Sequence, residues 1–255
     1  MKRLENKVAI ITGGAGLIGF TTALEIAREG ARVMLVDLDE NQLREKVAEA
    51  KEEGMEMEYV VADVTQSVQV QNYVDEAIGR YGRIDLFFNN AGIDGEVNLT
   101  ENYSEDSFDK VMAVNVKGVF LGMKYVIPKI QDGGSIVITS SIAGLIGEPG
   151  MVAYHASKHA VVGIMRTTAK EVAKRQIRVN SVHPGFVDSP MMRHIEKGIN
   201  PEDSTIAQGK LQRRVPLGRY AKAADVSKMV AFLFSDDAAY STGSTFVTDG
   251  GVVGR

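Results

Sequence analysis

A short apolar segment that runs into a glycine-rich turn constrains the fold of this chain more than any other feature. Val8 to Thr12 is rich in β-branched residues and stops at a glycine, as buried parallel strands do. The turn, residues 13–19, reads GGAGLIG and opens a helical stretch, Phe20 to Glu29, which Gly30 ends. Arg32 to Asp37 is a second apolar strand. The pattern predicts a strand–helix–strand unit with parallel strands.

The glycine turn and the acid that ends the second strand together favour a dinucleotide site. Backbone N–H groups and the dipole at a helix N-terminus attract a pyrophosphate, and glycine lets the backbone approach it. Asp37 can accept hydrogen bonds from the ribose hydroxyls of an adenosine. Because Asp37 would repel a 2′-phosphate and the turn has no basic residue, we expect NAD as the cofactor rather than NADP. Glycine alone is common in such turns, so the prediction depends on the spacing to Asp37.

Strands and helices alternate along the rest of the chain. The further strands predicted are Glu56 to Ala62, Ile84 to Asn89, Ser135 to Ser140, Arg178 to His183 and Ser244 to Thr248. The further helices predicted are Asn41 to Glu53, Ser67 to Tyr81, Glu105 to Gln131, Val152 to Arg175 and Ala223 to Leu233. This order predicts an α/β fold: one doubly wound, Rossmann-like parallel sheet with helices on both faces, in a single domain over residues 1–255. Residues 191–220 lack a strand pattern, and we expect them to form a substrate lid.

Composition narrows the class of protein. At 255 residues, 44% hydrophobic and 24% charged, the chain is long enough to bury a large core, and its net charge of -4 with scattered Lys and Arg argues against nucleic-acid binding. It has no cysteine, which excludes disulfides and thiolate metal sites. His155 and His159 are an i,i+4 pair, but no HExxH frame surrounds them, so we expect no metal site. The first apolar run is too short for a signal peptide or a membrane span, and we expect a cytoplasmic protein without membrane contact.

Tyr154 and Lys158 are the leading candidates for catalysis. On a helix they form an i,i+4 pair on one face, and Ser141 follows the strand that precedes this helix. A nearby ammonium favours the phenolate and lowers the tyrosine pKa from its usual value of about 10. Tyr154 is therefore predicted to act as an acid or a base near neutral pH. A bare YxxxK also fits an ordinary surface helix, but ligands of such sheets bind at the carboxyl ends of the strands, where Ser141 lies.

In order and spacing, the motifs of this chain resemble those of the short-chain dehydrogenase/reductase family. The matching segments are TGGAGLIG (Thr12 to Gly19), Asp37, Asp63-Val64, NNAG (Asn89 to Gly92), Asn115, Ser141, YHASK (Tyr154 to Lys158) and PGFVDSP (Pro184 to Pro190). The resemblance runs from Lys7 to Gly251. It implies an NAD-dependent oxidoreductase that transfers a hydride between NAD(H) and a small secondary alcohol or ketone.

The resemblance also implies a role for each matching residue. Tyr154 would exchange a proton with the substrate oxygen, Ser141 would hydrogen-bond that oxygen, Lys158 would bind the nicotinamide ribose and lower the tyrosine pKa, and Asn115 would hold a water. The residues implied in cofactor binding are Gly13, Gly16, Leu17, Ile18, Gly19, Asp37, Leu38, Asp63, Val64, Asn90, Ala91, Gly92, Tyr154, Lys158, Pro184, Gly185, Val187 and Ser189. Two structural alternatives stay open: Asn115 as a helix-kink residue and Asp63 as a cap at a strand end.

The substrate is less constrained than the cofactor. The predicted pocket walls are Ile142 with Ala143, Glu148 to Met151, Asp94 to Tyr103 and Met191 to Arg214. The run FFNNAGIDG and the later PLGRY resemble the family's reductases of cyclic ketones, which favours a small cyclic or aryl substrate. The resemblance further implies a homotetramer built on the two longest predicted helices.

One departure from the family pattern keeps other functions open. Chains of this length usually carry TGxxxGxG, with a glycine at the position of Leu17, whereas this chain has Gly16 and reads TGxxGxxG. We expect a turn shifted by one residue, with Leu17 facing inward. This form resembles the sugar-nucleotide-modifying branch, so an epimerase or dehydratase is one alternative, although chain length argues against it. A 3-oxoacyl-(acyl-carrier-protein) reductase, which usually uses NADPH, and a non-catalytic NAD-binding protein are the others.

Overall fold

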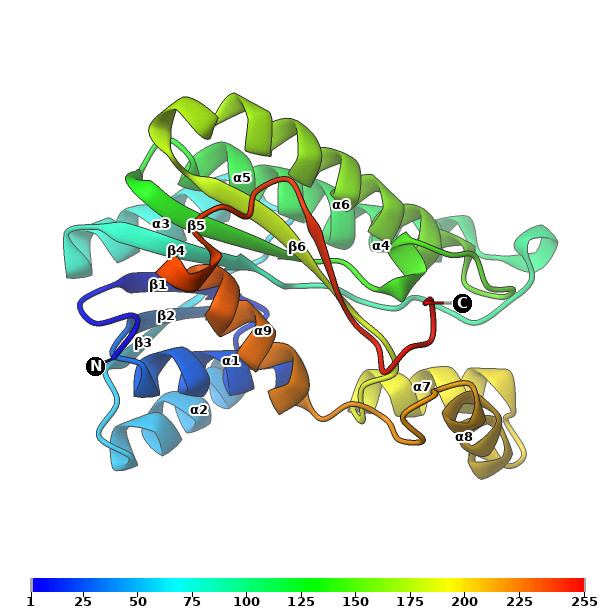
Figure 1. Ribbon diagram of the computed structural model, residues 1–255. Coiled ribbons are helices and arrows are strands. Elements are labelled where there is room, and N and C mark those ends of the chain that lie inside the picture. The colour runs from blue at the N-terminus through cyan, green and yellow to red at the C-terminus, as the bar shows by residue number, and fades with distance from the viewer. Residues whose placement is uncertain (1, 255) are drawn as a thin grey trace.

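A seven-stranded parallel sheet organises the computed structural model, which describes residues 2–254 (Figure 1). The strands, in the sheet order β3-β2-β1-β4-β5-β6-β7, have these bounds: β1 Val8–Thr12, β2 Arg32–Asp37, β3 Met57–Val61, β4 Ile84–Asn89, β5 Ile130–Thr139, β6 Arg178–Pro184 and β7 Thr245–Thr248. The helices are α1 Leu17–Arg28, α2 Glu40–Glu52, α3 Ser67–Tyr81, α4 Glu105–Met112, α5 Val119–Val126, α6 Val152–Glu171, α7 Pro190–Ile199, α8 Ser204–Arg213 and α9 Ala223–Phe234. The predicted doubly wound parallel sheet is confirmed.

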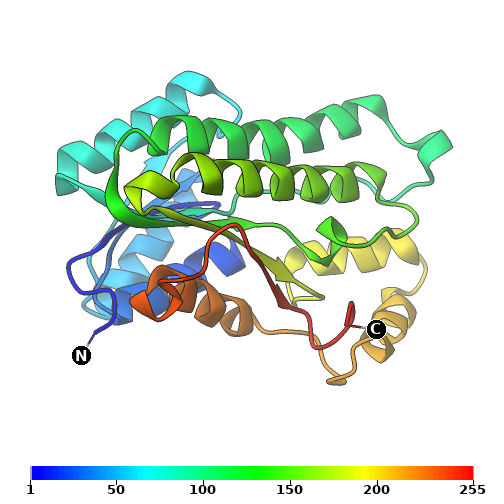
Figure 2. The same ribbon diagram turned by 45° about the horizontal axis from the view of Figure 1, so that its top comes forward.

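Helices bury both faces of the sheet. In Figures 1 and 2, α1, α2 and α9 lie on one side of it and α3, α5 and α6 on the other. Successive strand residues alternate between two cores, so that Ile11 packs with α1 and α9 while Ile10 packs with α3, α5 and α6. Burial on both faces explains why the strands are continuously apolar rather than alternating. Among residues 2–254, no helix is both long enough and apolar enough to cross a membrane.

The strand order reverses between β1 and β4, and this reversal positions the site. Chain connections leave the carboxyl ends of these two neighbours in opposite directions, which opens a crevice there. Helices α7 and α8 lie beyond the carboxyl end of the sheet, next to this crevice (Figure 1).

The structure corrects one predicted helix. The helical stretch expected over Glu105 to Gln131 ends at Val126, because Pro128 has no backbone N–H with which to continue the helical hydrogen bonds. The segment after the proline is already strand, so β5 begins at Ile130 rather than at residue 135. Pairing with β4 shifts register there, and Gly133, with a φ of +78°, lies in the bulge. Gly133 and Gly134, which precede the predicted strand, are therefore part of a bulged strand.

The predicted absence of strands from residues 191–220 is confirmed, but this segment contains two helices that the sequence did not predict. The hydroxyl of Ser189 caps α7 by accepting a hydrogen bond from the N–H of Met192 at 3.2 Å, and Asp203 caps α8. The two helices share a small apolar core with the chain around them, formed by Phe186, Met192, Ile195, Leu211 and Tyr220.

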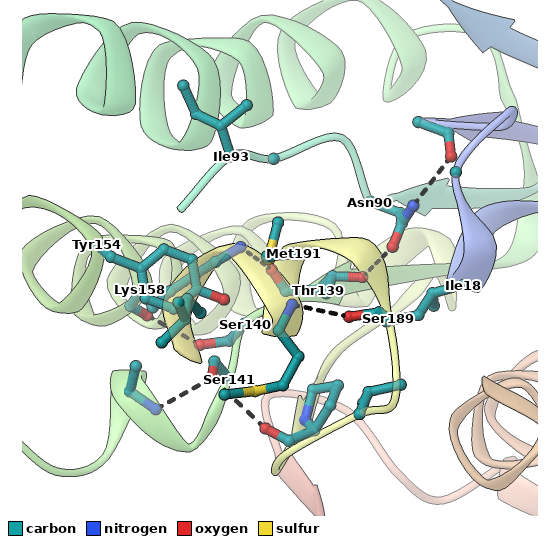
Figure 3. Close-up of a pocket in the computed structure, with 18 of the residues that line it drawn as sticks. Ile18, Asn90, Ile93, Thr139, Ser140, Ser141, Tyr154, Lys158, Ser189 and Met191 are labelled. Carbon is teal, nitrogen blue, oxygen red and sulfur yellow. Dashed lines mark hydrogen bonds between the residues drawn. The ribbon is translucent and has the colours of Figure 1, made fainter. Parts of the chain in front are cut away.

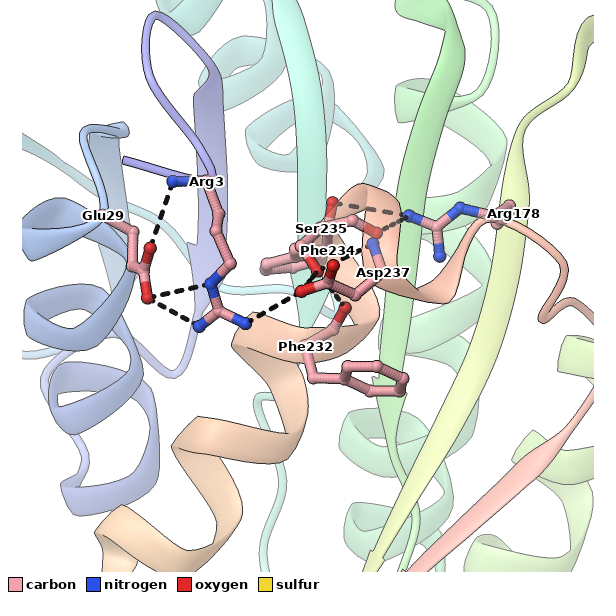
Figure 4. Close-up of polar contacts among 7 residues, drawn as sticks. All are labelled: Arg3, Glu29, Arg178, Phe232, Phe234, Ser235 and Asp237. Atoms are coloured by element: carbon pink, nitrogen blue, oxygen red, sulfur yellow. Dashed lines mark hydrogen bonds and ion pairs between the residues drawn. The ribbon is translucent and has the colours of Figure 1, made fainter. Parts of the chain in front are cut away.

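A buried arginine fixes the end of the sheet opposite the crevice (Figure 4). Arg178, the first residue of β6, is 8% exposed. Its guanidinium donates to three carbonyls at the end of α9, those of Leu233 (2.6 Å), Phe234 (3.4 Å) and Ser235 (3.1 Å). A positive charge is favourable there because helix carbonyls carry partial negative charge at the C-terminus. Nearby, Arg3 pairs with Glu29 and Asp237 and so joins α1 to the turn after α9.

Tyr73→Phe should stabilise the protein. Tyr73 on α3 is fully buried, and its hydroxyl has no hydrogen-bond partner within the described part of the chain. Because a buried hydroxyl without a partner is unfavourable, its removal should raise the free energy of unfolding by about 1 kcal/mol. Urea denaturation measures the change, with Tyr81→Phe as the control. The Tyr81 hydroxyl donates to the carbonyl of Val33 at 3.2 Å, so that variant should lose stability. A loss of stability in Tyr73→Phe would contradict this explanation.

Candidate active site

A cleft of about 660 Å³ opens at the carboxyl ends of the strands. It is lined by every residue that the sequence predicts to bind the cofactor, and by Ser141, Tyr154 and Lys158 of the four catalytic candidates. The fourth, Asn115, is buried and does not line the cleft. Residues that lie far apart in the sequence therefore share one cavity at the edge of the sheet where such folds bind ligands.

The turn after β1 packs so closely that a side chain is excluded at Gly13, Gly14 and Gly19. Gly13 has a φ of +65°, and a Cβ there would lie 3.0 Å from the Cα of Ala91. A Cβ on Gly19 would lie 2.1 Å from the carbonyl oxygen of Gly13. Helix α1 then begins after Gly16 with no side-chain cap and no acidic residue in its first turn, which leaves its first N–H groups available for an anion.

Leu17 does not take the predicted position. It is the first residue of α1, its side chain is 44% exposed, and it lines the cleft. The prediction that Leu17 faces inward is therefore wrong. The close packing inside the turn is made by Gly13, Gly14 and Gly19, whereas the side chain at position 17 is partly exposed at the cleft.

Two carboxylates are held at strand ends along the cleft. Asp37 accepts from the N–H of Ala15 at 3.0 Å with one oxygen and from the N–H of Leu38 at 2.7 Å with the other. Each oxygen keeps a lone pair for a further donor. Asp63 accepts from the N–H of Thr65 at 2.8 Å, so the structural alternative, a cap at the strand end, is present. Asp63 also lines the cleft, so the cap does not remove it from the candidate site.

Asn90 connects three strand ends beneath the cleft (Figure 3). Its side-chain nitrogen donates to the carbonyl of Thr12 at 3.1 Å, and its side-chain oxygen accepts from the hydroxyl of Thr139 at 2.9 Å. Its backbone N–H donates to the Thr12 hydroxyl at 2.9 Å. The side chain therefore fixes β1, β4 and β5 relative to one another.

Tyr154 and Lys158 project from α6 towards the cleft on the same side as Ser141 (Figure 3). The Lys158 ammonium donates to the carbonyl of Thr139 at 3.0 Å and lies 5.5 Å from the centre of the Tyr154 ring. Gly92 lies beside this pair, and a Cβ there would lie 3.2 Å from the side-chain oxygen of Asn115, so glycine leaves room for that side chain.

The pKa of Tyr154 is shifted in the direction opposite to the predicted one. Burial raises the pKa of Tyr154 to about 12; a hydrogen bond with Ser141 lowers it and the charge of Asp94 raises it further. Burial also lowers the pKa of Lys158 to about 8. The prediction that Lys158 lowers the tyrosine pKa is wrong for this geometry, because burial dominates and the ammonium is directed to the Thr139 carbonyl. At neutral pH Tyr154 holds its proton.

Asn115 lies in a π-helical turn, Ala113–Gly118, between α4 and α5. Its side chain donates to the carbonyl of Ile93 and accepts from the N–H of Ile93, both at 2.8 Å, and it also donates to the hydroxyl of Ser157 at 3.0 Å. Such wide helical turns occur frequently at functional sites. The helix is therefore irregular at Asn115, as the structural alternative for this residue expected. The Asn115 side chain also holds the backbone of Ile93, the residue that follows NNAG.

The half of the cleft beyond Ser141 is largely apolar. Of the predicted walls, Ile142, Ala143 and most of Glu148 to Met151 line it, whereas Asp94 to Tyr103 contributes only Val97. The segment Met191 to Arg214 contributes six residues: Met191, Met192, Ile195, Ile199, Leu211 and Arg214. Sequence reasoning missed further lining residues, among them Ile93, Thr139, Ser140, Ile146, His155 and Phe186. Most of these are apolar or small, so the sequence does not distinguish them from core residues.

Comparison with known proteins places the chain in a family. Residues 14–253 match the family model described as enoyl-(acyl carrier protein) reductase. The chain is similar to levodione reductase of Leifsonia aquatica, 39% identical over 98% of this chain and 95% of that protein. It is also similar to 3-oxoacyl-(acyl-carrier-protein) reductase of Thermotoga maritima, 42% identical over 98% and 99%, and to cyclohexanol dehydrogenase of an Acinetobacter strain, 38% identical over 97% and 95%.

Solved structures agree with these relationships. The crystal structure of levodione reductase superimposes with a TM-score of 0.95 and covers 98% of both chains. That of NAD+-bound xylitol dehydrogenase superimposes with a TM-score of 0.93 at 33% identity, over 98% of this chain and all of that one. The chain belongs to the short-chain dehydrogenase/reductase family, and it is an oxidoreductase.

Proposed function

We propose that this enzyme transfers a hydride between NAD(H) and a small secondary alcohol or ketone, of the cyclic or aryl kind. The observation that carries the proposal is the position of Ser141 and Tyr154. They lie in one cleft, between the glycine turn with Asp37 and a largely apolar wall. An apolar wall suits a compact hydrocarbon ring, and two relatives are named for levodione and cyclohexanol.

The residues of the cleft fit NAD. The N–H groups that begin α1 would hold the pyrophosphate, and the close packing at Gly13 and Gly19 would let it approach the backbone. Asp37 would accept from the ribose hydroxyls with its remaining lone pairs. Lys158 would bind the nicotinamide ribose, and the segment Pro184 to Ser189 would contact the carboxamide. When bound, the nicotinamide ring supplies or accepts the hydride.

Tyr154 and Ser141 handle the substrate oxygen. Because Tyr154 is protonated at neutral pH, it donates its proton to the carbonyl oxygen during reduction and receives it back during oxidation. The hydroxyl of Ser141 donates to the same oxygen and orients it. Asn115 holds the backbone of Ile93, and its side-chain oxygen keeps a lone pair for the water that carries protons to solvent.

Alcohol oxidation should accelerate as the pH rises, whereas ketone reduction should not. Oxidation needs the Tyr154 phenolate, and burial raises the pKa of Tyr154 to about 12, so the base form becomes more abundant throughout the alkaline range. Reduction uses the phenol, which is already the dominant form at neutral pH. Initial rates of both reactions against pH test this. An oxidation rate that is independent of pH from neutral to alkaline conditions would refute the role of the raised pKa.

NADH should bind more tightly than NADPH by at least about tenfold, because the Asp37 carboxylate repels a 2′-phosphate. Asp37→Ser should reduce that preference. Asp39→Ser is the matched control, since Asp39 caps α2 through Gln42, does not line the cleft, and serine preserves the cap. Fluorescence titration of each variant with both cofactors measures the preference. Equal affinities in the unsubstituted enzyme would contradict the proposed role of Asp37.

The experiment that tests the function is a screen for NAD-linked absorbance changes with secondary alcohols and ketones grouped as cyclic, aryl, sugar and acyl-thioester. The proposal predicts the highest kcat/KM for the cyclic or the aryl group with NAD(H). Turnover confined to sugars or acyl thioesters, or no turnover in any group, would overturn it.

Reduction of 3-oxoacyl thioesters is the second candidate, because the Thermotoga relative at 42% identity is named for that activity. Three arginines of residues 191–220 pair with acids: Arg193 with Asp188, Arg214 with Glu148, and Arg219 with Asp225. An acidic carrier protein would therefore meet charges of both signs there. A preference for acyl thioesters with NADPH in the same screen would favour this candidate.

We also propose a single domain in which residues 191–220 form the substrate lid. Its support is that α7 and α8 contribute to the apolar wall, and that His194 Nδ1 on α7 lies 2.7 Å from a carboxylate oxygen of Asp94, in the segment after β4. We further propose that the protein is cytoplasmic and forms a homotetramer. Phe120 on α5 is 52% exposed and would be buried in such an assembly. Light scattering that reports a monomer at micromolar concentration would exclude the tetramer.

A further inference from the structure

His183 is a buried titratable residue beside the active site that the proposed mechanism leaves unused. It is the last residue but one of β6 and has no exposed surface. Both of its ring nitrogens have partners. Nδ1 lies 2.9 Å from the carbonyl oxygen of Ser141, and Nε2 lies 2.8 Å from the hydroxyl of Ser181. The ring therefore connects the interior of β6 to the residue proposed to orient the substrate.

The partners define which nitrogen carries the hydrogen. A carbonyl oxygen only accepts, so Nδ1 must be the donor to Ser141, and Nε2 must accept the hydroxyl hydrogen of Ser181. A neutral ring satisfies both contacts. Burial lowers the pKa of His183 to about 4; the hydrogen bond to Ser141 opposes this shift, and the nearby charges of Lys158, Arg166 and His159 add to it. The ring is therefore neutral at the pH of ordinary assays.

Ser141 lies just beyond the hydrogen-bonded part of the sheet. The ladder between β5 and β6 ends with the pair Thr139–Val182, and the last backbone bond runs from the N–H of Ser140 to the carbonyl of Val182. The Ser141 hydroxyl itself donates to Pro184 over a long distance, 3.4 Å. The Ser141 carbonyl accepts from the N–H of Gly144 at 2.9 Å within its own turn.

We propose that His183 is a positioning residue that places the Ser141 hydroxyl by holding the Ser141 backbone against β6. Its Nδ1–H bond continues the attachment of β5 to β6 one residue past the end of the ladder. Without it, Ser141 would be held to β6 only by its own long hydroxyl bond. Small displacements of an orienting group lower the rate of the chemical step strongly. The glycine turn and Asp37, which make up most of the proposed cofactor site, belong to other segments of the chain. This inference rests on the proposed function, since it needs a reaction in which Ser141 orients the substrate oxygen.

Two amide substitutions separate the contacts of the ring. His183→Asn places an amide near Nδ1 and can still donate to the Ser141 carbonyl, whereas His183→Gln places it near Nε2 and can contact only Ser181. We expect His183→Asn to keep a kcat close to that of the unsubstituted enzyme and His183→Gln to lose about 10- to 100-fold in kcat. The Kd for NADH should be unchanged in both. Equal kcat values for the two variants, or a parallel loss of NADH affinity, would overturn the proposal.

A double-substitution cycle tests whether His183 acts through Ser141. In a Ser141→Ala background the orienting hydroxyl is gone, so adding His183→Gln should cause no further loss of kcat. Losses that multiply would show that His183 acts by another route and would overturn the proposal. Nitrogen-15 NMR of the histidine-labelled, unsubstituted enzyme needs no variant to fold, and it should show hydrogen on Nδ1 and not on Nε2. The opposite tautomer would overturn the proposal. A lack of turnover by the unsubstituted enzyme on any substrate would instead count against the proposed function.

Discussion

Tyr154→Phe should abolish almost all turnover while leaving NADH binding intact. The substitution removes the hydroxyl that exchanges a proton with the substrate oxygen, and a positioned acid or base contributes about 10²- to 10⁴-fold to such reactions. The ring itself remains, so its packing beside Lys158 and His155 is preserved. We expect kcat to fall by that factor and the Kd for NADH to stay nearly the same.

Steady-state kinetics and fluorescence titration check this prediction together. Tyr103→Phe is the control, because Tyr103 is a tyrosine of the neighbouring loop that does not line the cleft. It should retain nearly full activity. Activity retained in Tyr154→Phe would remove the proposed proton transfer, and a parallel loss of NADH binding would show that the substitution acts on the cofactor instead.

Gly19→Ala should be the most disruptive substitution in the glycine turn. The new Cβ would lie 2.1 Å from the carbonyl oxygen of Gly13 and 2.9 Å from its carbonyl carbon, and backbone atoms cannot move aside as a flexible side chain can. We expect a loss of about 3 kcal/mol or more in the free energy of unfolding, together with the loss of NADH binding, because the turn must open to accept the methyl group.

Gly79→Ala provides a matched control for this prediction. Gly79 is also a helical glycine, within α3, but a Cβ there would meet nothing within 4 Å. Alanine has the higher helix propensity, so Gly79→Ala should stabilise the protein by about 0.5–1 kcal/mol. Thermal and urea unfolding measure both variants. Similar effects of the two substitutions would contradict the steric explanation for Gly19.

The features that sequence predicted best are those in which local chemistry and global fold agree. Three elements have the predicted bounds: the strands Val8–Thr12 and Arg32–Asp37 and the helix Ser67–Tyr81. In each, a clear hydrophobic pattern stops at a glycine or a turn, so the local sequence defines where the element ends. The helix expected up to Gln131 was wrong at its end. The segment after this helix is the start of β5. The register shift and the bulge at Gly133 arise from the pairing of β5 with β4, a tertiary contact with no local signature in the sequence.

In the candidate site, too, features with a local sequence signature were predicted and features that depend on tertiary contacts were not. Asp37, Tyr154 and Lys158 were predicted from motif spacing, and the structure gathers them in one cleft. The direction of the Tyr154 pKa shift could not be predicted, because it depends mainly on how deeply the folded structure buries the hydroxyl, which the adjacent sequence does not show. His183 was overlooked for a similar reason, since its role depends on a contact with Ser141, 42 residues away in sequence.

Transfer of deuterium from NADH labelled at its hydride position tests the central claim most directly. The labelled cofactor is incubated with the enzyme and a cyclic ketone such as cyclohexanone, and the product alcohol is analysed by mass spectrometry and NMR. We predict deuterium on the carbinol carbon, with the proton on oxygen drawn from solvent through Tyr154, and a rate of product formation by Tyr154→Phe that is about 10²- to 10⁴-fold lower. An alcohol product without deuterium on that carbon would contradict hydride transfer from NADH, and product formation by Tyr154→Phe at the full rate would contradict the proposed proton transfer.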